Sequence, residues 1–199
     1  MIKKYIGEDG FRYYVKKTEL FSTKSVVAIG IGAALYSVLS GVAIPVGPNT
    51  SFRIAVALLT IFGAIFGPLV GFFVGFVGHA LNDMIMWGSV WFSWVFLSAV
   101  IGLFGGLITL DKSFSLETGH VTKVHIFKMY LYAILGMIFA GLAAYIGDVY
   151  FYGEPAQKVW IQIALATLTN FAVTATLGIP IILGIAARKR KYSNLKIED

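Results

Sequence analysis

Ionisable and aromatic side chains gather in one short stretch of this chain, between two long apolar runs. His79 and Asp83 are four residues apart and would share one face of a helix, with Asn82 beside them. Trp87 and Trp91 follow directly. Aromatic rings beside a few polar groups are typical of a pocket for a small, flat, partly polar molecule. These five residues are therefore predicted to bind a substrate.

Each of these residues also has a purely structural interpretation. A tryptophan near a membrane surface can belong to an interfacial aromatic belt. His79 could hydrogen-bond a neighbouring helix, and Asp83 could pair with Arg53. Asn170 lies further along the chain, and its amide could bind either a ligand or a second helix. Tyr145 and Asp148, at the outer end of the fifth span, are weaker candidates.

The composition places these polar groups in an apolar environment. Of the 199 residues, 58% are hydrophobic and 13% are charged, and the mean hydropathy is +0.81. This is too apolar for a soluble domain. No cleavable signal peptide is expected, because a charged arm without a small-residue cleavage site precedes the first apolar run. The excess positive charge is assigned to the membrane edges and anionic lipid, so no nucleic acid partner is expected.

The apolar runs predict an all-α integral membrane protein with six transmembrane helices. A bilayer core is crossed by about twenty apolar residues. The predicted spans are residues 25–44, 50–66, 69–86, 90–110, 129–147 and 159–187. Residues 1–24 are predicted to form a cytoplasmic arm or a short amphipathic helix on the membrane surface. Residues 188–199 are predicted to be a basic cytoplasmic tail.

The basic residues decide between one helix and two in the apolar run that is interrupted only at Gly67-Pro68. With a turn there, fourteen of the sixteen Lys and Arg residues fall on one side, and only Arg53 and Lys158 fall on the other. A single helix would leave seven on one side and nine on the other. By the positive-inside rule the turn is favoured and both termini are cytoplasmic. The polar cluster around His79 then opens to the exterior.

Catalytic and phosphate-binding motifs are absent from the sequence. It contains no G-x-x-x-x-G-K-[ST] phosphate loop, no H-E-x-x-H zinc motif and no G-x-S-x-G nucleophile elbow. His120 and His125 fall in a loop on the side opposite His79, so a three-histidine metal site is not expected. The sequence predicts neither an enzyme nor a bound cofactor.

Small residues recur every four positions in several spans, a spacing that lets helices approach closely in lipid. The first span carries two such pairs, Ala28 with Gly32 and Gly30 with Ala34. One neighbouring helix needs only one of these faces. The four residues are therefore predicted to dock another membrane protein, with packing inside the bundle as the alternative.

Five segments carry a family resemblance: 22–34 (STKSVVAIGIGAA), 48–50 (PNT), 66–68 (FGP), 78–83 (GHALND) and 154–159 (EPAQKV). Together they resemble the substrate-binding S components of energy-coupling factor (ECF) vitamin transporters. The similar branch is labelled riboflavin-type, and its members are also linked to hydroxymethylpyrimidine and pyridoxine. In that branch a basic residue often stands at the position of Asn82, and an acidic one is common at that of Arg53. These differences leave the identity of the vitamin open.

The resemblance implies six helices and a ligand pocket near the outer face of a bacterial plasma membrane. It implies that the loop 45–51 caps the pocket, where Asn49 is best placed to touch the ligand. It also implies that Ala28 and Gly32 dock a transmembrane coupling (T) subunit. Two ATP-binding cassette ATPases below that subunit would drive the S component to topple and release a vitamin inward.

Two other classes of protein compete with this interpretation. A stand-alone transporter or channel would need an inverted repeat or a continuous line of polar residues across the membrane. An intramembrane enzyme would need a reactive cluster at the cytoplasmic edge. Neither pattern is present in the sequence. The S component is therefore the preferred prediction, with pyridoxine or hydroxymethylpyrimidine as favoured ligands and riboflavin next.

Overall fold

The computed structural model describes residues 2–6, 12–16, 22–47 and 50–194, and most of these residues are helical. The α-helices are α1 (Thr23–Ser40), α2 (Val56–Phe66), α3 (Pro68–Trp87), α4 (Phe92–Gly106), α5 (Lys123–Ile146), α6 (Ala156–Val173) and α7 (Ile179–Asn194). A 3-10 turn, η1 (Leu107–Leu110), extends α4, and two π-helical segments, η2 (Gly147–Phe151) and η3 (Thr174–Gly178), extend α5 and join α6 to α7. The antiparallel strand pairs are β1 (Ile2–Ile6) with β2 (Arg12–Lys16), and β3 (Ala43–Gly47) with β4 (Thr50–Arg53).

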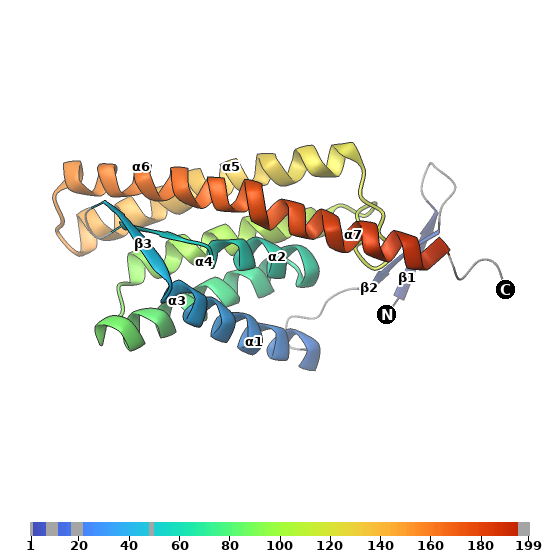
Figure 1. The fold of residues 1–199 in the computed structure, drawn as a ribbon, viewed down its shortest axis with the longest axis horizontal. Helices are drawn as coiled ribbons and strands as arrows, with labels where there is room; N and C mark the ends of the chain where they lie inside the picture. The colour runs from blue at the N-terminus through green and yellow to red at the C-terminus, as the bar shows by residue number, and fades with distance from the viewer. Residues whose placement is uncertain (1, 7–11, 17–21, 48–49, 195–199) are drawn as a thin grey trace.

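The helices lie along the long axis of the molecule in two groups (Figure 1). Helices α5, α6 and α7 run along one side, α1 and α3 lie on the other, and α2 and α4 lie between them. The hairpin of β3 and β4 reaches from the end of α1 across to α6, which β4 contacts. The polar cluster therefore lies beneath the hairpin, between the two groups of helices.

Five helical stretches in the described residues are long and apolar enough to cross a membrane. They are Thr23–Ser40, Pro68–Trp87, Phe92–Leu110, Lys123–Phe151 and Ala156–Lys191. The remaining apolar helix, α2, has only 11 residues, whereas a bilayer core needs about twenty. The all-helical membrane bundle is thus present, but the helix in the place of the second predicted span is too short to cross a bilayer by itself.

The turn predicted at Gly67-Pro68 separates α2 from α3. Helix α2 ends at Phe66, and Gly67 has a φ of 103°, a conformation that side chains with a Cβ atom rarely adopt. Pro68 then begins α3, where its missing N–H group costs no helical hydrogen bond. The chain therefore reverses direction at this point.

The predicted span 50–66 is wrong in its first part. Residues 50–53 form strand β4, which pairs with β3, and the loop expected at 45–51 is mostly part of this hairpin. Pro45 lies within β3 and has no N–H group for a helical turn, so the chain stays extended there. For the same reason α1 ends at Ser40, four residues before the predicted end of the first span at residue 44.

Three other boundaries differ from the prediction. Helix α5 starts at Lys123, six residues before the predicted start at 129, because Thr122 and His125 form a capping box. The last helical stretch begins at Ala156 and continues through Asn194, so the basic residues 188–191, predicted to lie in a tail, are helical. In the N-terminal arm, residues 2–6 and 12–16 are strands and form no amphipathic helix. Their aromatic and β-branched residues favour strands.

The tightest helix contact lies between α3 and α4. A Cβ atom on Gly71 would overlap the carbonyl oxygen of Gly102, and one on Gly75 would overlap that of Ser98. The small-residue ridge predicted for this part of the chain therefore packs backbone against backbone, as expected for helices in lipid. This seam brings the polar residues of α3 next to those of α4.

Candidate functional site

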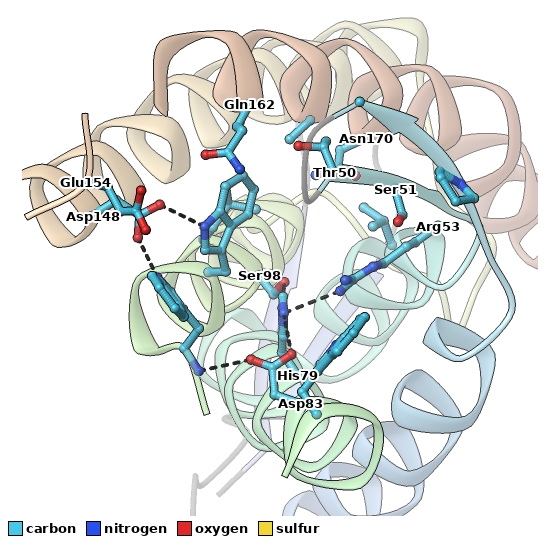
Figure 2. A pocket seen from close by; sticks show the side chains of 18 of the residues that line it. Thr50, Ser51, Arg53, His79, Asp83, Ser98, Asp148, Glu154, Gln162 and Asn170 are labelled. Carbon is cyan, nitrogen blue, oxygen red and sulfur yellow. Dashed lines mark hydrogen bonds and ion pairs between the residues drawn. The ribbon is translucent and has the colours of Figure 1, made fainter. Parts of the chain in front are cut away.

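A cavity of about 620 Å³ lies beneath the β3–β4 hairpin. Its walls come from α1, β3, β4, α3, α4, η2 and α6. The polar lining shown in Figure 2 consists of Thr50, Ser51, Arg53, His79, Asp83, Ser98, Asp148, Glu154, Gln162 and Asn170. The aromatic lining consists of Tyr36, Trp87, Trp91 and Trp94. The cavity thus combines ring surfaces with both acidic and basic groups.

His79 connects three walls of the cavity. Its Nδ1 lies 2.6 Å from Ser98 Oγ, which in turn lies 3.0 Å from the hydroxyl oxygen of Tyr36. Its Nε2 lies 3.3 Å from Arg53 Nη1 and 3.4 Å from Asp83 Oδ1. A guanidinium group can only donate, so the contact with Arg53 makes Nε2 an acceptor and leaves the Nδ1 proton for Ser98. Protonated at Nε2 as well, the ring would also donate to Asp83.

Asp83 fixes the start of α4. Its Oδ2 accepts a hydrogen bond from the backbone N–H of Trp91, at 3.1 Å. Trp91 is the residue that precedes α4, and Gly88, with a φ of 70°, ends α3 three residues earlier. The short connection between the two helices is therefore held by a carboxylate that also faces the cavity.

Asp148 forms a second polar centre on segment η2, and only 2% of it is exposed. Its Oδ1 accepts hydrogen bonds from Trp91 Nε1, at 2.7 Å, and from the hydroxyl group of Ser93. Its Oδ2 accepts one from Trp94 Nε1, at 2.9 Å. The indole of Trp91 also stacks on Tyr152, with ring centroids 4.6 Å apart. Asp148 therefore holds two tryptophan rings at the cavity wall.

Helix α6 supplies the remaining wall. Near its start, Lys158 Nζ lies 2.6 Å from Glu154 Oε2 and the two side chains form an ion pair. Gln162 and Asn170 follow on the same face and are both buried. This wall therefore presents a matched pair of charges and two amides to the cavity.

The structure brings five of the eight predicted substrate-binding residues to this cavity: His79, Asp83, Trp87, Trp91 and Asn170. Trp87 is 74% exposed and lies at the rim. Asn49 lies outside the described residues. Neither of the other two lines the cavity.

Those two residues have packing roles. Asn82 donates from Nδ2 to the backbone oxygen of Ser37, at 3.1 Å, and so links α3 to α1. The ring of Tyr145 packs against Trp160, with centroids 4.9 Å apart. The structure thus gives both residues contacts with neighbouring helices and does not bring them to the cavity.

Other lining residues were missing from the main predicted set; those with the clearest polar contacts are Tyr36, Arg53 and Ser98, and Asp148 was predicted only as a weaker candidate. Ser98 lies among the small residues of α4, a pattern typical of helix packing, and Tyr36 lies in an apolar stretch of α1 with no charged residue nearby in sequence. The signal for the other two is stronger. Arg53 and Asp148 are charged residues at the edges of apolar runs, on the side of the membrane predicted for His79.

The four small residues of α1 divide between two environments. Ala28 and Gly32 are buried, and a Cβ atom on Gly32 would lie 2.7 Å from Val74 Cγ2. Their predicted role in docking a partner is corrected, since they pack inside the bundle. Gly30 and Ala34 are exposed, and no atom lies within 4 Å of a Cβ atom placed on Gly30.

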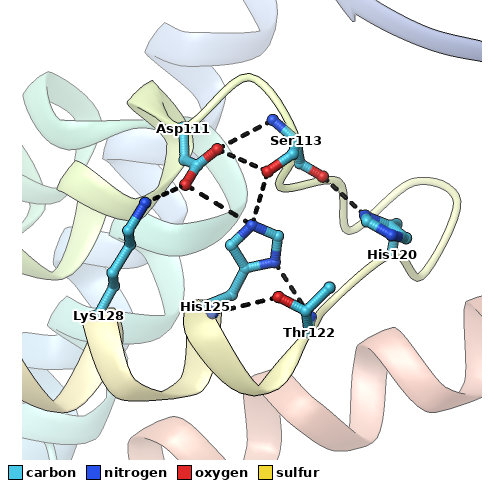
Figure 3. A network of polar contacts seen from close by, with 6 residues as sticks. All are labelled: Asp111, Ser113, His120, Thr122, His125 and Lys128. Carbon is cyan, nitrogen blue, oxygen red and sulfur yellow. Dashed lines mark hydrogen bonds and ion pairs between the residues drawn. The ribbon is translucent and has the colours of Figure 1, made fainter. Parts of the chain in front are cut away.

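A second polar cluster, here called the loop network, lies at the opposite end of the molecule from the hairpin (Figures 1 and 3). Its members are Asp111, Ser113, His120, Thr122, His125 and Lys128. Asp111 accepts from Lys128 Nζ, at 2.5 Å, and from the backbone N–H and hydroxyl group of Ser113. Burial raises the pKa of Asp111, but these hydrogen bonds outweigh burial and hold the pKa below its usual value.

The loop network contains a serine, a histidine and an aspartate, but its hydrogen bonds do not suit nucleophilic catalysis. His125 Nδ1 accepts the backbone N–H of Thr122, so its Nε2 carries the proton and donates to Ser113 Oγ, 2.9 Å away. The Ser113 hydroxyl group donates to Asp111. A general base would instead have to accept the serine proton. Within the described residues no group of three His, Cys, Asp or Glu side chains could hold a metal ion.

Comparison with known proteins agrees with a membrane bundle around a ligand cavity. Residues 20–187 match the family described as ECF-type riboflavin transporter, S component. A UPF0397 protein of Lactobacillus johnsonii is 42% identical over 178 residues, which cover 88% of this chain and 95% of that protein. A solved structure of ThiT from Listeria monocytogenes shares the fold, with a TM-score of 0.58, 18% identity, and coverage of 82% of this chain and 94% of that one. The chain therefore belongs to the family of ECF-type riboflavin transporter S components, the substrate-binding membrane subunits of ECF transporters.

Proposed function

We propose that this chain captures a flat, water-soluble vitamin or vitamin precursor in its cavity, as the S subunit of an ECF-type ABC importer. Pyridoxine or hydroxymethylpyrimidine is the favoured ligand, and riboflavin is next. One observation carries the proposal: the cavity has about 620 Å³ and is lined by aromatic rings and by acidic, basic and amide groups. Small-molecule sites have volumes of about 300–1,000 Å³ and combine apolar walls with a few placed polar groups.

The rings and the polar groups have separate roles in the proposed site. Trp91 and Trp94 offer indole surfaces for apolar contact with a heteroaromatic ring. His79, Asp83 and Asn170 supply directional hydrogen bonds. Asn49, which lies outside the described residues, is also proposed to touch the ligand. A ligand lacking the matching polar groups would leave buried groups unpaired, at a cost of about 1–3 kcal/mol each.

We further propose that the protein lies in a bacterial plasma membrane with both termini in the cytoplasm. This orientation follows from the fourteen Lys and Arg residues that a turn at Gly67-Pro68 places on one side. The cavity then opens to the exterior and the loop network faces the cytoplasm. Cysteines introduced at Ser89 and at Lys112 should react with an impermeant maleimide from outside and from inside, respectively. The reverse pattern would contradict the orientation.

The chain contains no phosphate loop, so transport requires partners that hydrolyse ATP. We propose a transmembrane coupling subunit and two ATP-binding cassette ATPases, which make the S subunit topple and expose its cavity inward. The exposed residues Gly30 and Ala34 of α1 are the proposed docking surface. Ala34→Trp should abolish co-purification with the coupling subunit and keep vitamin binding. The matched control Ile138→Trp, on the exposed surface of α5, should co-purify normally. A normal yield from Ala34→Trp would refute this surface.

The ligand itself can be identified directly. Native mass spectrometry of the purified chain should detect a bound vitamin, because tightly bound ligands persist through purification. Isothermal titration calorimetry with pyridoxine, hydroxymethylpyrimidine and riboflavin then ranks the three. Binding of one of them to the folded wild-type protein supports the proposed function. If none of them binds to folded protein and no other vitamin co-purifies, the proposal is wrong.

A further inference from the structure

Two charged side chains face each other across the cavity, and neither forms a direct ion pair in the part of the chain that the structure describes. Asp148 and Arg53 lie on opposite sides of the view in Figure 2. Glu154 and Lys158, which also line the cavity, neutralise each other. Among residues 22–47 and 50–194, neither Asp148 nor Arg53 forms an ion pair within 4.0 Å. The cavity therefore has an acceptor carboxylate on one wall and, on the other, a guanidinium group beside His79 and Asp83.

Asp148 forms the negative pole. Trp91, Ser93 and Trp94 all donate to its side chain, so the carboxylate acts as an acceptor. The three donors are uncharged, so they support its negative charge and leave it uncancelled. Oδ2 accepts only one of these hydrogen bonds, and a carboxylate oxygen can accept two. A positive or N–H-bearing group of a ligand fits this acceptor.

Arg53 forms the positive pole. Its Nη1 lies 3.3 Å from His79 Nε2, and that nitrogen is an uncharged acceptor when the guanidinium group donates to it. Asp83 does not pair with Arg53 directly, because His79 lies between them and contacts both. A guanidinium group has five N–H donors, so most of them remain for a ligand. A negatively charged oxygen, or a ring substituent rich in lone pairs, fits this pole.

We propose that Arg53 and Asp148 select a ligand with separated charges and fix its orientation across the cavity. The positive or N–H-bearing pole of the ligand lies against Asp148, and its negative oxygen lies against Arg53. This inference rests on the proposed function and narrows its substrate class to bipolar heteroaromatic molecules. A 3-hydroxypyridine has this character, because its ring nitrogen can take up the proton of its hydroxyl group. In a site with little water each of these contacts is stronger than in solution.

The test is a double-mutant cycle in which one change is made in the protein, at Arg53 or Asp148, and the other in the ligand, at its hydroxyl group or its ring nitrogen. The ligands are pyridoxine, its 3-deoxy analogue, and an analogue with benzene in place of the pyridine ring. Each is titrated calorimetrically against wild type, Arg53→Met and Asp148→Asn. Wild type should bind pyridoxine at least tenfold more tightly than either analogue. Arg53→Met should remove only the preference for pyridoxine over the 3-deoxy analogue. Asp148→Asn should remove only the preference for pyridoxine over the benzene analogue.

Two controls exclude general damage to the protein. Asp111→Asn makes the same carboxylate-to-amide change in the loop network and should keep both preferences. If Asp148→Asn does not fold, because it holds two tryptophans, the comparison of the three ligands on wild type still decides. Equal binding of all three ligands to wild type would overturn the inference.

Other outcomes separate this inference from the proposed function. If a replacement weakens all three ligands equally, or if only hydroxymethylpyrimidine or riboflavin binds, the charged poles do not select the ligand. In both cases the proposed vitamin capture stands and the inference fails. If no vitamin binds to folded wild-type protein, both fail.

Discussion

The cavity and the loop network contain the same kinds of side chain, but they use them differently. Each has an aspartate and a serine in contact with a histidine, with a basic residue beside them. In the loop network Lys128 binds Asp111 directly, at 2.5 Å. In the cavity Arg53 meets His79, and no ion pair of the described residues joins it to a carboxylate.

This difference separates a structural cluster from a candidate binding site. Hydrogen bonds that are completed within the protein hold a loop in place and leave little for a ligand. Groups that face a cavity with spare donors or acceptors can gain those partners from a ligand. The residue types alone would not separate the two regions, because the arrangement of partners decides the role.

The largest expected effect is a loss of vitamin affinity when residues of the cavity are replaced. Asp83→Ala should weaken vitamin binding at least tenfold, because the carboxylate holds the N–H of Trp91 and contacts His79. Trp91→Ala should weaken binding to a similar degree, because it removes a ring of the cavity wall. Calorimetric titration measures both. Unchanged affinity in both folded variants would remove these residues from the site.

The second prediction concerns the loop network. Asp111→Ala should leave vitamin affinity within twofold of wild type, because Asp111 lies outside the cavity lining. It should lower stability by about 1–2 kcal/mol through the lost hydrogen bonds, which corresponds to several degrees in Tm for a chain of this size. Thermal unfolding in detergent, followed by fluorescence, measures this loss. A large drop in affinity with an unchanged Tm would reverse the assigned roles of the two regions.

The smallest effect is a pH dependence. The pKa of Asp111 is lower in the folded protein than its usual value of about 3.9, so the folded state binds this proton more weakly than the unfolded state. The stability that Asp111 contributes is therefore complete above about pH 4, and is lost as the pH falls through the folded pKa. The difference in Tm between wild type and Asp111→Asn should stay constant from pH 8 to 5 and shrink below about pH 4. Shrinkage already between pH 8 and 5 would contradict this assignment.

The sequence predicted those parts of the site that local patterns encode. His79 and Asp83 are noticeable because they are ionisable residues in an apolar run, and Trp91 follows at a helix boundary. The turn at Gly67-Pro68 could also be predicted, since proline and glycine restrict or release the backbone locally. In each of these cases the physical cause lies within a few residues of the position.

The rest depends on contacts between distant segments. The hydroxyl groups of Tyr36 and Ser98 meet across 62 positions, and neither residue differs locally from its packed neighbours. Asp148 receives donors from residues 54 to 57 positions away. Thr50–Arg53 forms a strand only because β3 lies beside it. A single sequence does not contain these pairings in a readable form.

The glycine seam of α3 and α4 has a consequence for the chemistry of the cavity. The backbones of α3 and α4 touch at Gly71 and Gly102, so a side chain at either position would force the two helices apart. His79 lies about two turns from Gly71 on α3 and Ser98 about one turn from Gly102 on α4, so the glycine packing helps to set the 2.6 Å separation of His79 Nδ1 and Ser98 Oγ. A bulky residue introduced at Gly71 would therefore change the His79–Ser98 hydrogen bond without contacting either residue.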